Sequence, residues 1–98
     1  MTSDDTTGSD LARLRNLMAL GQERERAREA ARLSLDHARR AYVELLAHPG
    51  AIDPETQRRA NLTVHEAERA LDAAARAVRD VQRDISVARL EYEEHSRR

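Results

Sequence analysis

The stretch VHEAERALDAAARAVRDVQRDISVARLEY, residues 64–92, decides the fold. It carries a seven-residue repeat in which two positions are never charged. The first position holds Val, Leu, Ile or Tyr and the second holds Ala or Val: Val64, Leu71, Val78, Ile85 and Tyr92, with Ala67, Ala74, Val81 and Ala88. We call the stripe formed by these two positions the seam. Nine successive uncharged seam positions predict a long helix that packs along one stripe against another helix.

The preceding half of the chain repeats with the same period, less perfectly. Its two seam positions hold Leu14, Gly21, Arg28, Leu35 and Tyr42, and Leu17, Arg24, Ala31, Ala38 and Leu45. The repeat is apolar at both ends and is interrupted in the middle by two arginines. Each guanidinium is expected either to bind an acidic partner or a phosphate, or to reach water while its aliphatic stem lies along the seam.

Breakers and capping residues set the expected boundaries. Residues 1–9 are small, polar and acidic, which predicts a flexible N-terminal arm, with Ser9 or Asp10 as the N-cap of a helix over 10–47. The sequence His48-Pro49-Gly50 ends that helix, and a turn is expected over 48–53. Asp53 as N-cap and Pro54 at the first helical position then predict a second helix over 54–96.

Folding the chain at this turn places large seam residues opposite small ones. In the expected register Leu14 faces Ala88, Gly21 faces Val81, and Leu35 faces Ala67. Such pairing lets two helices approach closely without leaving voids. The predicted fold class is therefore all-α, a long antiparallel helical hairpin with coiled-coil-like packing.

Two helices alone leave much of their surface in water, so we expect this hairpin to belong to a four-helix bundle or a larger helical assembly. Small or apolar residues also flank the seam, which widens the apolar stripe beyond that of a strict two-stranded coiled coil. The residues expected to face a partner are Leu20, Ala27, Ala70, Ala73 and Ala77, together with Arg24 and Arg28.

Composition excludes several classes of protein. With 98 residues the chain is one small domain at most, and its only aromatic residues are Tyr42 and Tyr92, which argues against a β-sandwich or barrel. It has no Cys, hence no disulfide framework or thiolate site. No signal peptide or transmembrane segment is recognisable, so a cytoplasmic location or a place within a macromolecular assembly is expected.

No catalytic motif appears, and no catalytic, cofactor-binding or metal-binding residue is assigned. None of the four histidines forms a ligand pair with metal-site spacing. We therefore expect no enzyme activity, no cofactor, no small-molecule substrate and no membrane partner. The expected function is that of a structural, assembly or adaptor protein acting through helix–helix contacts, as a homo-oligomer or with a helical protein partner, including as a component of a virion.

Two alternatives stay open. The first is a small regulator that binds nucleic acid, or an enzyme acting on it, through the arginines between Arg13 and Arg40. Nucleic acid is the less expected partner, because acids are interspersed among these arginines and the net charge is −1. The second is suggested by the layout, which resembles the small secreted helical hairpins defined by a Trp-x-Gly turn. The turn here, His48-Pro49-Gly50, contains no Trp.

Overall fold

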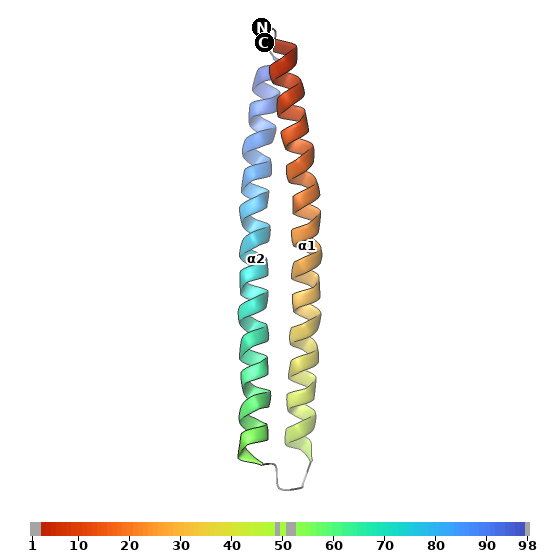
Figure 1. Cartoon of the computed structure of the whole chain (residues 1–98), viewed down its shortest axis with the longest axis vertical. Helices are drawn as coiled ribbons and strands as arrows, with labels where there is room; N and C mark the ends of the chain where they lie inside the picture. The colour runs from red at the N-terminus through yellow and green to blue at the C-terminus, as the bar shows by residue number, and fades with distance from the viewer. Residues whose placement is uncertain (1–2, 49, 51–52, 98) are drawn as a thin grey trace. The chain divides into compact units, whose positions relative to one another are not determined.

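The computed structural model describes residues 3–48, 50 and 53–97 and is an all-α helical hairpin. Helix α1 spans Ser3–Ala47 and helix α2 spans Pro54–Ser96 (Figure 1). No strand occurs among the described residues. The fold class predicted from the repeat is confirmed.

The second helix begins and ends at the predicted residues. Asp53 lies immediately before the first helical residue, Pro54, and its carbonyl oxygen accepts a hydrogen bond from the backbone nitrogen of Gln57 at 3.1 Å. Its carboxylate Oδ2 accepts a second one from Thr56 Oγ1 at 3.4 Å. The proline needs no backbone donor at this position, and its fixed φ suits a first helical residue. Residues 49, 51 and 52 of the expected turn lie outside the described part of the chain.

The beginning of α1 differs from the prediction, although its end at Ala47 agrees with it. The sequence predicted a flexible arm over 1–9 and a helix start at residue 10, but α1 already begins at Ser3. Ser9 and Asp10 are therefore inside the helix rather than at its cap. The expectation for residues 1 and 2 lies outside the described residues. The composition of the first helical residues does not favour a helix, but packing supports one. Thr7 and Asp10 are half-buried, and the Asp10 carboxylate contacts the His95 ring of α2.

The chain divides into two compact units, each built from one segment of α1 beside one segment of α2 (Figure 1). Unit 1 consists of Met1–Arg26 and Arg76–Arg98. Unit 2 consists of Ala27–Ala75 and includes the turn.

Within each unit, the α1 segment packs against the α2 segment along the predicted seam. All nine seam positions of α2 are buried or half-buried, as are the seam positions of α1 except Arg24, which is exposed. Among the described residues, the buried apolar side chains of unit 1 are Leu14, Val78, Val81 and Ala88, and that of unit 2 is Leu35. Burial of apolar side chains is the main stabilising contribution in such a small core. The seven-residue repeat therefore identified the residues that form it.

Polar contacts in unit 1 bridge the two helices beside the seam. Arg13 Nη1 donates a hydrogen bond to Glu91 Oε2 at 2.7 Å, next to the buried pair Leu14 and Ala88. On the other side of the seam, Gln82 Nε2 donates to Glu25 Oε1 at 3.4 Å. Polar contacts between the two helix segments therefore lie on both edges of the seam.

Candidate docking faces

The residues predicted to face a partner are divided between the two units. Leu20, Arg24 and Ala77 come together in unit 1, where they line one surface groove. The other four belong to unit 2: Ala27, Arg28, Ala70 and Ala73. The seven residues therefore form two groups, one in each unit.

The groove in unit 1 has a volume of about 300 Å³ and an acidic edge. Asp80 and Asp84 of α2 line it together with Arg24, and the buried Val81 forms part of its floor. Within the described residues Arg24 forms no salt bridge, and its side chain is exposed. This placement fits the second reading of the interrupted seam, in which the stem lies over apolar residues while the guanidinium reaches water beside two carboxylates.

Arg28 has a different environment, although it occupies an equivalent place in the repeat. It lies in unit 2 and is half-buried, while Ala27 beside it is exposed. The two seam arginines are therefore not interchangeable. A larger part of Arg28 is withdrawn from water, so replacing it disturbs more packing than replacing Arg24.

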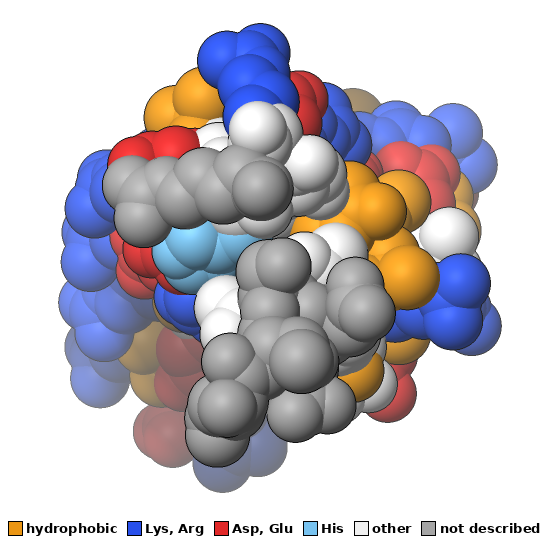
Figure 2. Space-filling model, turned by 90° about the horizontal axis from the view of Figure 1, so that it is seen from above, with side chains coloured by type: hydrophobic (Ala, Val, Ile, Leu, Met, Phe, Trp, Pro, Cys, Tyr) orange, Lys and Arg blue, Asp and Glu red, His pale blue; other side chains and the backbone are white. Residues whose placement is uncertain are grey.

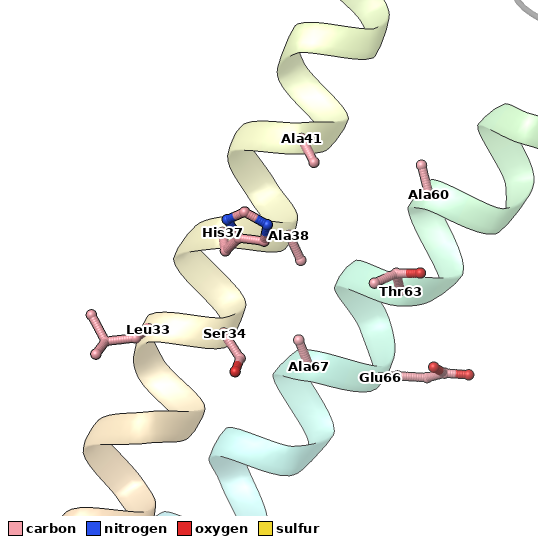
Figure 3. A pocket seen from close by; sticks show the side chains of 9 residues that line it. All are labelled: Leu33, Ser34, His37, Ala38, Ala41, Ala60, Thr63, Glu66 and Ala67. Carbon is pink, nitrogen blue, oxygen red and sulfur yellow. The ribbon is translucent and has the colours of Figure 1, made fainter.

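Unit 2 carries the larger groove, a hollow of about 700 Å³ between α1 and α2. Most of its lining is apolar or small: Leu33, Ser34, Ala38 and Ala41 from α1, with Ala60, Thr63 and Ala67 from α2. Two titratable side chains complete it, His37 on α1 and Glu66 on α2. Figure 3 shows Ala38 and Ala41 pointing from α1 towards α2, while Leu33 and Glu66 point outwards on opposite sides. We call this surface the alanine groove.

The alanine groove is open because the residues beside this edge of the seam are too short to cross it. Ser34 and Ala41 precede the seam residues Leu35 and Tyr42, and neither has a side chain that reaches α2. At the same level Thr63 is equally short and exposed. A groove of this width, lined by small side chains, can accommodate the ridge of another helix.

The other edge of the seam in unit 2 is closed by charged residues. Arg39 Nη2 lies 3.9 Å from Glu68 Oε2, and His65 Nδ1 lies 3.4 Å from Glu68 Oε1. Arg39 and Ala41 are two residues apart, which places them about 160° apart around the helix and so on opposite edges of the seam. Unit 2 therefore has one edge with long polar side chains that cross between helices, and one edge without them.

A separate ion-pair cluster lies on the surface of α1. Arg32 Nη2 lies 2.6 Å from Glu29 Oε1, and Arg32 Nη1 lies 3.2 Å from Asp36 Oδ2. The hydrogen bond from Arg32 lowers the pKa of Glu29, and the same bond raises the pKa of Arg32. All three side chains are largely in water, so this cluster satisfies charges along one helix and forms no buried site.

The repeat identified the small residues that flank the seam, but the sequence did not predict the polar margin of the alanine groove. Ala70 and Ala73, which were predicted to face a partner, are exposed and do not line the groove. His37 and Glu66 do line it, and neither was predicted as a partner-facing residue. The sequence does contain a signal for them. His37 and Glu66 each lie within about one helical turn of a small residue that flanks the seam, and they lie at matching levels on the two helices.

Across residues 3–48, 50 and 53–97 no group of three or more His, Cys, Asp or Glu side chains is placed to hold a metal ion. Neither helix contains, within its described span, an apolar stretch long enough to cross a bilayer. Basic and acidic side chains are interspersed around the outside on the view shown in Figure 2.

The chain was also compared with known proteins, and no family model, curated protein or solved structure matches it.

Proposed function

We propose that this protein is a non-enzymatic assembly or adaptor module that acts by packing the alanine groove of unit 2 against other helices. The observation that carries the proposal is the difference between the two edges of unit 2. One edge is spanned by Arg39 and Glu68, while the other is an apolar hollow of about 700 Å³. Large exposed apolar surfaces on small proteins commonly mark interaction sites.

A small chain gains directly from such packing. Leu35 is the one buried apolar side chain among the described residues of unit 2, and Leu33 at the margin of the groove remains 55% exposed. A helix laid into the groove removes Leu33, Ala38 and Ala41 from water together. That burial adds hydrophobic stabilisation where the two-helix unit provides little of its own.

The arginines of α1 support the nucleic-acid alternative less strongly than the alanine groove supports helix–helix packing. Arg13, Arg32 and Arg39 each lie within salt-bridge distance of an acidic side chain. Their charge is therefore partly neutralised within the chain. Favourable phosphate binding depends on several unneutralised cations acting together, so helix–helix packing is the preferred proposal.

The test is to fill the alanine groove with a charged side chain and measure association. Ala41→Glu places a carboxylate in the groove, and Ala19→Glu is the matched control, since Ala19 is also an exposed alanine inside α1 but does not line the groove. Circular dichroism checks that both variants remain helical. Photo-crosslinking from position 41 in the native host, followed by mass spectrometry, identifies any protein that occupies the groove.

We expect Ala41→Glu to abolish association and Ala19→Glu to preserve it, and we expect a photoreactive residue at position 41 of the otherwise unchanged chain to crosslink to the occupant of the groove. Crosslinks to copies of this chain or to a helical segment of another protein support the proposal. A chain that crosslinks to no protein from position 41, or whose associations Ala41→Glu leaves unchanged, overturns it.

A further inference from the structure

We infer that the occupant of the alanine groove is a second copy of this chain, related by a two-fold axis parallel to the helices, so that two units 2 form a four-helix bundle. The inference rests on the proposed function and specifies its partner. Its basis is the polar and charged side chains at the margins of the groove, which take no part in the seam contacts of unit 2.

The two margins of the groove carry complementary side chains at matching levels. His37 on α1 and Glu66 on α2 both line the groove. Glu44 follows His37 by seven residues, and Arg59 precedes Glu66 by seven residues. Because α1 and α2 run in opposite directions, both steps lead two helical turns towards the connection between the helices. Glu44 and Arg59 are therefore level with each other if His37 and Glu66 are.

A two-fold axis parallel to the helices keeps every residue at its own level and places α2 of one copy beside α1 of the other. His37 of each copy then meets Glu66 of its partner, and Glu44 meets Arg59. Moving seven residues the other way along each helix brings Ala30 level with Ala73, two small residues that permit close approach. Opposite charges, Glu44 and Arg59, thus face each other at one level, an imidazole that can donate a hydrogen bond faces a carboxylate at the second, and a small pair faces at the third.

These side chains are available for contacts between copies. Glu44 and Arg59 are both exposed. Arg59 lies 3.4 Å from Glu55 in its own helix, yet its side chain remains 79% exposed, so its guanidinium can take a further carboxylate. Complementary charges at the margin of an interface set which partner and which register are chosen.

The complementarity is confined to unit 2. The corresponding pair in unit 1 is Glu23 and Asp80, which carry like charges and would repel across the same kind of two-fold axis. We therefore assign the self-association surface to Ala27–Ala75 and leave unit 1 outside it.

The experiment is a charge exchange between Glu44 and Arg59, read by sedimentation equilibrium. Each single variant, Glu44→Arg or Arg59→Glu, replaces both attractive pairs of the symmetric dimer by repulsive ones. We expect each to weaken self-association by about tenfold or more. An equimolar mixture of the two variants restores both attractive pairs in the heterodimer, as does the double variant Glu44→Arg/Arg59→Glu in its own dimer.

The expected loss of association in the single variants is not explained by unfolding. Glu44→Arg places a cation near the C-terminus of α1, and Arg59→Glu places an anion nearer the N-terminus of α2, so neither change opposes the helix dipoles. Glu44→Gln and Arg59→Gln serve as milder variants, each expected to weaken association less than the charge reversal at the same site. Arg97→Glu, in unit 1, is the control and is expected to leave association unchanged.

Recovery of association in the mixture and in the double variant supports the inference. A mixture as weak as the single variants overturns it, because copies packed head to tail or through another surface do not pair position 44 with position 59. A wild-type chain that stays monomeric up to about 1 mM also overturns it. If position 41 nevertheless crosslinks to a different helical protein, the proposed function stands and only self-association is lost.

Discussion

Gly21 of α1 lies against Ile85 of α2 at the seam of unit 1. A Cβ atom built on Gly21 would stand 3.2 Å from Ile85 Cδ1 and 3.9 Å from Val81 Cγ1. The predicted register placed Val81 opposite this glycine, and Ile85 is its neighbour one turn along the same helix. The absence of a side chain at position 21 makes room for two larger ones, which is the pairing of large with small residues expected along the seam.

This contact makes the size of residue 21 a sensitive test of the seam. Gly21→Ala is expected to raise the free energy of unfolding by about 0.5 kcal/mol, because alanine favours the helix by about 1 kcal/mol and the flexible end of Ile85 needs to move only slightly. Gly21→Leu is expected to lower it by about 1–3 kcal/mol through overpacking. Urea unfolding measures both, and a strongly destabilising Gly21→Ala would show that Ile85 cannot move.

The two valines at positions 78 and 87 form a matched pair of the same residue type in the same helix segment. Val78 is 1% exposed and Val87 is 43% exposed. Val78→Ala is expected to cost about 1.5–3 kcal/mol of unfolding free energy, since it removes apolar surface from the core and leaves a cavity. Val87→Ala should change stability by less than about 0.5 kcal/mol. Equal losses in thermal or urea unfolding would contradict the assigned core.

The ion pair between Arg13 and Glu91 is expected to contribute little. Its side chains are 51% and 43% exposed, so water and salt screen their attraction. A double-mutant cycle with Arg13→Gln and Glu91→Gln should give a coupling of about 0.2–1 kcal/mol at low salt. We expect that coupling to fall at high salt. A larger, salt-independent value would mean that the pair is shielded from water.

Duplex nucleic acid should bind only weakly. The net charge is −1, and three arginines of α1 already lie beside carboxylates. At physiological salt a fluorescence-anisotropy titration with a DNA or RNA duplex should give a Kd no tighter than about 10⁻⁴ to 10⁻⁶ M, the range of non-specific binding. A submicromolar, salt-resistant complex would favour the regulator alternative over helix packing.

The sequence allowed the hairpin to be predicted because its signals are local and repeated. Asp53 and Pro54 mark a helix start by their own chemistry, and the uncharged seam of α2 recurs every seven residues. The start of α1 was predicted wrongly because it depends on packing. Thr7 is a poor helix former, and the contact of Asp10 with His95 joins residues from opposite ends of the sequence.

The docking surface was only partly predictable for a related reason. A helical repeat identifies which positions flank the seam, and the small or apolar residues at those positions predicted a wide apolar stripe. It does not show whether the flanking side chains of the two helices meet across the seam. Arg39 and Glu68 approach each other and close one edge, whereas Ala41 and Thr63 are too short to close the other.

The central claim, that another helix covers the alanine groove, is tested most directly by thiol accessibility. The chain contains no cysteine, so a single introduced thiol reports on its own position. Ala41→Cys places it in the groove and Asn61→Cys places it on an exposed position of α2 that does not line the groove. Alkylation rates are measured in native cells and in dilute purified protein. We predict that Cys at position 41 reacts about tenfold or more slowly in cells than in dilute solution, while Cys at position 61 reacts at the same rate in both. Equal reactivity of the two thiols in cells and in dilution would contradict the account.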